Sequence, residues 1–194
     1  AILLVTPYYN KPPQNALFAH FRAVAAATKL PVMIYNVPGR TGRNIEAPTV
    51  ARLAHEVPNI VAVKEAGGNL DQVSEICSLV PEGFAVYSGD DSLTLPMLSL
   101  GAKGVVSVAS HIVAGQMRQM IAGFTQGDWK HAKDIHLRYF SVFKGLFFTT
   151  SPSPVKSALK LMGFPVGGLR LPLLPLTEAE EEKLKGILQE AGLI

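Results

Sequence analysis

The stretch Ile60-Val61-Ala62-Val63-Lys64-Glu65-Ala66 joins a short apolar run to a lysine, and the loop Gly67-Gly68-Asn69 follows it. Three of the first four side chains are β-branched. A run of this kind is typical of a parallel-sheet strand that is buried on both faces. The stretch therefore predicts an α/β protein in which Lys64 lies at the carboxyl end of a buried strand.

The position of Lys64 has a chemical consequence. Ligands of α/β proteins bind at the carboxyl ends of the parallel strands. A lysine there is poorly solvated, so its neutral amine is favoured and can form a Schiff base with a carbonyl substrate. Alternatively, Lys64 extends to water at the rim or pairs with Glu65. For a lysine considered alone this structural interpretation is the more common one, and only the rest of the chain favours the nucleophile.

Strand-like and helical patterns alternate along the first two thirds of the chain. The strand-like runs are Ile2–Val5, Pro31–Tyr35, Ile60–Lys64, Phe84–Tyr87 and Gly104–Val108. The helical patterns between and after them are Leu17–Thr28, Ala47–His55, Leu70–Leu79, Ser92–Leu100 and His111–Gln126. Strands that alternate with helices in this way indicate βαβ units and a parallel sheet.

After Gly127 the alternation stops. The remaining helical patterns are Asp128–Phe148, Pro152–Met162 and Thr177–Glu190, the last of which opens with a capping-box sequence. We therefore expect a partial (β/α) barrel of five strand-helix units in residues 1–127 and a helical region in residues 128–194.

Five strands cannot close an eight-stranded (β/α)8 barrel. The chain opens with Ala1-Ile2-Leu3-Leu4-Val5, already inside a strand-like run. An open sheet that is complete in itself is one interpretation. The opening favours the other, a TIM barrel that lacks its first three βα units and is followed by a C-terminal helical extension.

Composition limits the partners and the compartment. The net charge of +3 comes from dispersed Lys and Arg without a basic run, which argues against nucleic acid. Cys77 is the only cysteine, so the sequence predicts no disulfide framework and a reducing cytoplasm. No apolar run is long enough to span a bilayer, and we expect no membrane partner.

Polar residues follow each predicted strand. Tyr8 and Tyr9 follow the first strand, and for these two residues considered alone packing at the rim is the favoured interpretation. Tyr35 ends the second strand and precedes a turn that carries Arg40. A phenol can transfer protons, and a guanidinium can hold a carboxylate with two hydrogen bonds. With Lys64 on the third strand, these residues indicate carbonyl chemistry on an anionic substrate.

Metal-dependent alternatives are weaker. Asp90-Asp91 follows the fourth strand, but no histidine or third carboxylate has suitable spacing, so helix N-capping is favoured. The five histidines are scattered over helical patterns: His20, His55, His111, His131 and His136. We expect no metal and no separate cofactor.

Four ordered motifs resemble one family. They are Val5-Thr6-Pro7-Tyr8-Tyr9-Asn10, Tyr35-Asn36-Val37-Pro38-Gly39-Arg40-Thr41-Gly42, Val63-Lys64-Glu65-Ala66 and Ser88-Gly89-Asp90-Asp91. They resemble the dihydrodipicolinate synthase family, which belongs to the pyruvate-dependent class I aldolase superfamily shared with N-acetylneuraminate lyase. The similarity extends along essentially the whole chain.

The resemblance implies roles for individual residues. Lys64 would form a covalent imine with pyruvate, and Tyr35 would be the general acid/base beside it. Tyr9 would complete a proton relay across a dimer interface at which Tyr8 packs. Arg40 would bind the carboxylate of aspartate semialdehyde.

The same resemblance implies that Gly89 and Val106 line the pyruvate pocket, chiefly through backbone groups. The product would be 4-hydroxy-tetrahydrodipicolinate, the precursor of diaminopimelate and lysine. The protein would assemble as a homotetramer, a dimer of dimers.

One departure from the family affects the expected activity. Members carry a Gly-Thr-Thr-Gly-Glu type motif in an amino-terminal part, and the present sequence has no such motif. We therefore expect this chain to be catalytically incomplete by itself. Two alternative functions are a related pyruvate-dependent sugar-acid aldolase or lyase, against which Arg40 argues, and a non-catalytic assembly partner.

Overall fold

The computed structural model describes residues 1–194, which form two compact units, Ala1–Val106 and Ser107–Ile194. The first unit contains every strand and the second contains only helices. The sequence predicts a different division, after residue 127, between the strand-helix units and the helices that follow them. That division stays a prediction.

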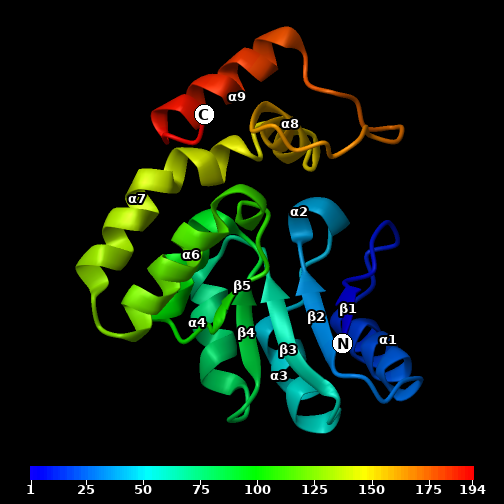
Figure 1. Ribbon diagram of the computed structural model, residues 1–194. Coiled ribbons are helices and arrows are strands. Elements are labelled where there is room, and N and C mark those ends of the chain that lie inside the picture. The colour runs from blue at the N-terminus through cyan, green and yellow to red at the C-terminus, as the bar shows by residue number, and fades with distance from the viewer. The chain divides into compact units, whose positions relative to one another are not determined.

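The first unit is built on one five-stranded parallel sheet with the strand order β1-β2-β3-β4-β5. The strands are β1 (Ile2–Val5), β2 (Val32–Asn36), β3 (Ile60–Glu65), β4 (Ala85–Ser88) and β5 (Gly104–Val105). Their arrowheads point to the same edge in Figure 1. The predicted parallel sheet is therefore confirmed, and all five carboxyl ends share one edge.

Helices follow each of the first four strands within this unit. They are α1 (Gln14–Ala26), α2 (Pro38–Thr41), α3 (Ala47–Glu56), α4 (Leu70–Leu79), the 3-10 helix η1 (Asp91–Leu93) and α5 (Thr94–Ser99). Figure 1 shows α3 and α4 behind the sheet. The prediction for α4 is correct at both ends. The predicted helix Ser92–Leu100 is instead divided, because Pro96 has no N–H and its ring conflicts with an uninterrupted helix.

The strand register gives the sheet two different faces. One row across the sheet consists of Leu4, Ile34, Val63 and Val86, and it packs in the same apolar core as side chains of α1, α3 and α4. On the opposite face, Ala62 of β3 is 4% exposed, whereas Val61, beside the register shift between β2 and β3, is 41% exposed. The prediction that β3 is buried on both faces is therefore confirmed at Ala62 and wrong at Val61.

The fifth strand is shorter than predicted. β5 ends at Val105, although the sequence pattern extends to Val108. The reason is that β4 ends at Ser88, which pairs with Val105, so the following residues have no strand to pair with. One further backbone hydrogen bond, from Val106 N to Ser88 O at 2.8 Å, closes this end of the sheet.

The second unit contains four helices, α6 (Ser110–Thr125), α7 (Trp129–Gly145), α8 (Ser153–Leu161) and α9 (Glu178–Glu190). All four predicted helices of this part are confirmed, with ends that differ by three residues or fewer. The predicted capping box is present, because Thr177 and Glu180 exchange hydrogen bonds at the start of α9. No helix of the chain is long and apolar enough to cross a membrane.

The capping box gives a stability prediction. Thr177→Ala removes the Thr177 Oγ1 acceptor from Glu180 N, so we expect the free energy of unfolding to fall by about 1 kcal/mol. Urea denaturation followed by circular dichroism measures the change. Thr125→Ala, at the exposed end of α6, is the matched control. Equal stability of Thr177→Ala and the parent chain would contradict the prediction.

Candidate active site

The register of the sheet places two predicted site residues side by side. Tyr35 on β2 is the register partner of Lys64 on β3, and Lys64 is in turn the partner of Tyr87 on β4. Because side chains alternate between the faces of a strand, these three side chains lie on one face. All three belong to the carboxyl-terminal halves of their strands, as the sequence predicts for Lys64 and Tyr35.

The Lys64 amine lies against the Tyr35 ring, with Nζ 4.0 Å from the ring centroid. Lys64 is half-buried, and this burial lowers the pKa of its amine below the ordinary lysine value. The Asp91 carboxylate opposes this change in the pKa, whereas the Arg40 guanidinium adds to it. The amine is therefore neutral over a wider pH range than an exposed lysine.

Tyr35 keeps its phenol proton to higher pH than an exposed tyrosine. Burial raises the pKa of the phenol, and the charge of Arg40 opposes the increase. The strand end that carries Tyr35 is held by Thr6, whose N–H and Oγ1 both donate to Tyr35 O, at 2.9 and 3.0 Å. Thr6 is fully buried, and no pattern in the sequence predicted that it would hold the end of β2.

Gly89 packs directly against the Lys64 side chain. A Cβ at this position would lie 2.7 Å from Ala66 Cβ and 2.9 Å from Lys64 Cε, which is closer than such atoms approach. The Gly89 N–H donates to Glu65 O at 2.7 Å, and the Val106 N–H donates to Ser88 O. Both predicted pocket residues therefore lie at the strand ends, but their N–H groups are already bonded within the sheet.

Arg40 lies on α2, directly after β2. Pro38 begins this one-turn helix, and Gly42 ends it with a φ of 68°, which a residue with a side chain rarely adopts. Arg40 is exposed, yet its charge acts on the pKa values of both Lys64 and Tyr35. The predicted turn is therefore a short helix that presents a guanidinium to the same end of the sheet.

Tyr8 and Tyr9 do not join the Lys64–Tyr35 pair within this chain. Their side chains are 67% and 91% exposed. The backbone of Tyr9 has a φ of 63° and that of Lys11 a φ of 44°, conformations that are unusual outside glycine. The segment after β1 is thus a constrained loop that presents two phenol rings to solvent.

Glu65 does not pair with Lys64, so the structural alternative for Lys64 is wrong in this respect. Neighbouring residues of a strand point to opposite faces. The Glu65 carboxylate is buried on the other face, where it accepts hydrogen bonds from Asn36, Gly67 and Gln72. The period of two in the strand pattern was the signal that could have excluded a pair between Lys64 and Glu65.

The acidic pair after β4 has two separate roles. Asp90 caps η1, since its carboxylate accepts from Ser92 N and Ser92 Oγ, as the sequence predicts. Asp91 is 1% exposed, and its carboxylate raises the pKa of Lys64. This second role followed from no signal in the sequence.

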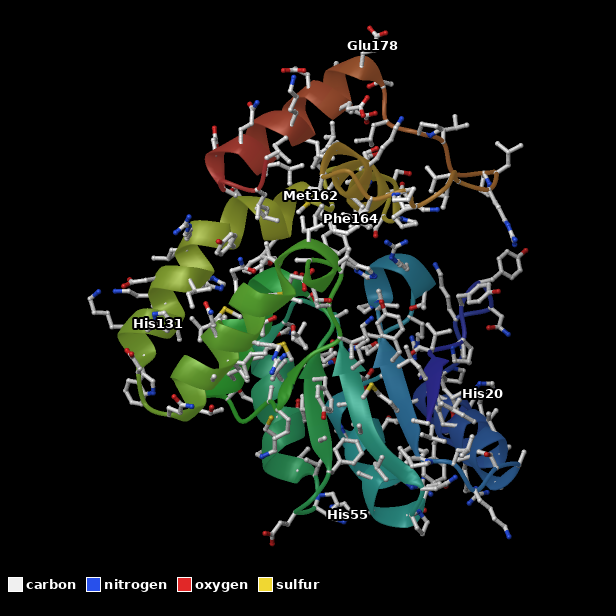
Figure 2. The ribbon with its side chains drawn as sticks, in the orientation of Figure 1. His20, His55, His131, Met162, Phe164 and Glu178 are labelled. Atoms are coloured by element: carbon white, nitrogen blue, oxygen red, sulfur yellow. The ribbon has the colours of Figure 1, made fainter.

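Two of the histidines lie away from the Lys64 amine. Figure 2 shows His20 on α1 and His55 at the end of the sheet opposite the arrowheads. No group of three or more His, Cys, Asp or Glu residues is placed to hold a metal ion. The groups near the Lys64 amine are the Tyr35 phenol, the Arg40 guanidinium and the Asp91 carboxylate.

Known proteins are similar to this chain along nearly its whole length. The model of the dihydrodipicolinate synthetase family matches residues 1–191. The 4-hydroxy-tetrahydrodipicolinate synthase of Desulforamulus reducens is 55% identical over 193 residues, covering 100% of this chain and 65% of the relative. The chain thus spans about 65% of the length of such curated relatives.

Solved structures agree with the fold. A dihydrodipicolinate synthase from Cyanidioschyzon merolae, solved with lysine bound, has a TM-score of 0.96 and 52% identity, covering 99% of this chain and 65% of that one. A chloride-inhibited dihydrodipicolinate synthase from Acinetobacter baumannii, complexed with pyruvate, has a TM-score of 0.94 and 42% identity, covering 99% and 66%. The predicted partial TIM barrel with a helical extension is confirmed, and the chain belongs to the dihydrodipicolinate synthetase family.

Proposed function

We propose that this chain carries the imine-forming part of a 4-hydroxy-tetrahydrodipicolinate synthase. Lys64 would condense with pyruvate, and the resulting enamine would add to L-aspartate semialdehyde in the diaminopimelate and lysine pathway. The observation that carries the proposal is the half-buried Lys64 amine, 4.0 Å from the Tyr35 ring centroid at the carboxyl end of β3. The names of the relatives and the pyruvate complex of the Acinetobacter baumannii protein support it.

The first step requires an unprotonated amine. The Lys64 nitrogen uses its lone pair to attack the ketone carbon of pyruvate, and the carbonyl oxygen takes up a proton. Loss of that hydroxyl group as water then leaves the imine. Burial of Lys64 lowers its pKa and so increases the fraction of amine that can attack near neutral pH.

Tyr35 would supply and recover the protons of these steps. Its raised pKa keeps the phenol protonated, so it can donate to the departing hydroxyl and later accept a proton from the substrate methyl group. Removal of that methyl proton converts the imine to an enamine, whose carbon then forms the new bond to the aldehyde. The reaction uses the covalent imine on Lys64 and needs neither a metal nor a separate cofactor.

Arg40 would bind the carboxylate of the aldehyde. Its guanidinium is exposed at the strand ends and is electrostatically coupled to both Lys64 and Tyr35. An arginine can hold a carboxylate through two parallel hydrogen bonds. This feature favours a short anionic aldehyde over the long sugar acids of the related lyases.

The exposed loop after β1 supports an oligomeric enzyme. Tyr9 and Tyr8 are largely exposed in the single chain, and an aromatic pair of this kind is suited to burial in an interface. We infer that Tyr9 completes the proton relay of a second copy and that Tyr8 packs beside it, within a tetramer built from two dimers. We expect the protein in the cytoplasm, because its single cysteine, Cys77, is free, as is usual in a reducing compartment.

The imine step is tested by covalent trapping. Incubation of the chain with pyruvate and sodium borohydride should give a reduced pyruvyl adduct on Lys64, detected by peptide mass spectrometry. Lys64→Ala should give none, while Lys103→Ala, on an exposed lysine before β5, should behave as the parent. A folded parent chain without the adduct would contradict the proposal and would favour a non-catalytic assembly partner.

The contact between Gly89 and Lys64 gives a second test. Gly89→Ala forces a Cβ into the space of the Lys64 side chain, so we expect trapping of pyruvate to fall at least tenfold and stability to fall by about 1–3 kcal/mol. Gly39→Ala is the matched control, because its added Cβ has no atom within 4 Å. Equal trapping rates for Gly89→Ala and the parent would show that this contact does not position the amine.

A further inference from the structure

A second polar cluster lies on the face of the sheet opposite Lys64. We call it the strand-end network, and it consists of Asn36, Asn44, Glu65 and Gln72. Asn36 Nδ2 donates to both Glu65 carboxylate oxygens, at 3.0 and 2.9 Å, and to Asn44 Oδ1 at 2.7 Å. Gln72 Nε2 donates to Glu65 Oε2 at 3.1 Å, and Asn44 Nδ2 donates to Gln72 Oε1 at 2.7 Å.

Glu65 is the charged centre of the network. It is 2% exposed and has no cation within salt-bridge distance, so its charge is stabilised only by neutral donors. Burial raises the pKa of this carboxyl group, and the hydrogen bonds from Asn36, Gly67 and Gln72 oppose the increase. A buried carboxylate without a counter-ion is costly, and every one of its donors must be held in place.

The loop after β3 is shaped for this carboxylate. Gly67 N donates to Glu65 Oε1 at 2.6 Å, and a Cβ on Gly67 would lie 2.7 Å from the same oxygen. A side chain at position 67 would therefore have to displace the Glu65 carboxylate from its present position. The side chain of Glu65 thus holds the loop Gly67-Gly68-Asn69 through the hydrogen bond from Gly67 N.

The network also closes the segment that carries Arg40, residues 37–43, which contains α2 and which we call the Arg40 turn. Asn36 precedes this segment and Asn44 follows it, and Asn36 Nδ2 donates to Asn44 Oδ1. Asn36 Oδ1 accepts from Ile45 N at 3.1 Å, which adds a second bond across the base of the turn. The backbone of Asn36 accepts from Ala66 N at 2.9 Å, so the base of the turn is attached to β3.

We propose that Glu65 is a positioning residue that fixes the Arg40 turn relative to Lys64 and so sets the affinity for the carboxylate of the acceptor. This inference rests on the proposed function, in which Lys64 holds pyruvate and Arg40 holds the acceptor. Glu65 touches neither substrate. It acts through Asn36 and Asn44, which determine where the turn begins and ends.

Glu65→Gln is the most direct perturbation, because it keeps the size of the side chain. The Glu65 carboxylate is the acceptor in all four of its hydrogen bonds. The NH2 group of a glutamine would face one or more of these donors with another donor, so that those bonds would be lost. The base of the Arg40 turn should then loosen, while Lys64 on the other face keeps its contact with Tyr35. Glu82→Gln makes the same chemical change at an exposed turn and is the matched control.

Two measurements on the full chain distinguish an effect at Lys64 from an effect at Arg40. Borohydride trapping with pyruvate reports on Lys64. Titration with L-homoserine, the alcohol that corresponds to the proposed aldehyde, reports on Arg40 through the NMR resonance of its Nε–H, which Arg40→Lys identifies. Homoserine has no carbonyl carbon that Lys64 could attack as it attacks a ketone.

We expect Glu65→Gln to bind homoserine about tenfold more weakly than the parent, with unchanged trapping at Lys64. Asn44→Ala, which opens the base of the turn without changing the carboxylate, should show the same separation if Glu65→Gln folds poorly.

The outcomes distinguish this inference from the proposed function. A parent chain that traps pyruvate but shows no saturable response to homoserine overturns the proposed role of Arg40 and the inference with it. If Glu65→Gln and Asn44→Ala titrate like the parent, the inference alone is wrong. A parallel loss of trapping and homoserine binding in both variants would mean that the network only stabilises the fold, which also overturns it.

Discussion

The side chains of β2 and β3 alternate regularly from the Met33–Ala62 pair to the carboxyl ends of both strands, beyond a register shift between Val32 and Met33, and this alternation determines the geometry of the site. It places Tyr35 and Lys64 on one face and Asn36 and Glu65 on the other, with the two rows adjacent in the same register. A shift of one residue would bring the carboxylate of Glu65 to the reactive face and bury the amine of Lys64 against the helices. The apolar row of Leu4, Ile34, Val63 and Val86 prevents that shift, because only one register buries it.

The reactive face is governed by a balance of charges around a half-buried amine. Burial and Arg40 favour the neutral form of Lys64, whereas Asp91 favours the ammonium. The Tyr35 ring also attracts the ammonium through its face. A nucleophilic lysine needs such a compromise, since a fully buried amine could not exchange protons and an exposed one would stay protonated.

Much of this arrangement could be predicted from local patterns. The apolar run before Lys64 and the helical period of Leu70–Leu79 indicated β3 and α4 because neither depends on distant residues. The helix α2 was missed because four residues are too few for a periodic pattern, although Pro38 and Gly42 are typical of a helix start and end. Its closure by Asn36 and Asn44 could not be predicted from either residue alone.

The strand-end network shows what a single sequence does not reveal. Glu65 and Gln72 come from different elements, and nothing in their spacing indicates that both bond to Asn36 or Asn44. The same holds for Asp91, whose electrostatic effect on Lys64 depends on the sheet that brings β3 and β4 together. The positions of Lys64 and Tyr35 at the strand ends could therefore be predicted from the sequence. The hydrogen bonds and charges that surround them could not.

The fold makes the Lys64 amine easier to deprotonate than that of an exposed lysine. A titration of 13Cε-labelled lysines by NMR measures this directly, with the Lys64 resonance identified by its absence in Lys64→Arg. We expect a midpoint below the ordinary lysine value of 10.5, and a still lower one in Asp91→Asn. A midpoint for Lys64 at or above 10.5 would show that burial does not favour the neutral amine, which would then be no more available than that of an exposed lysine.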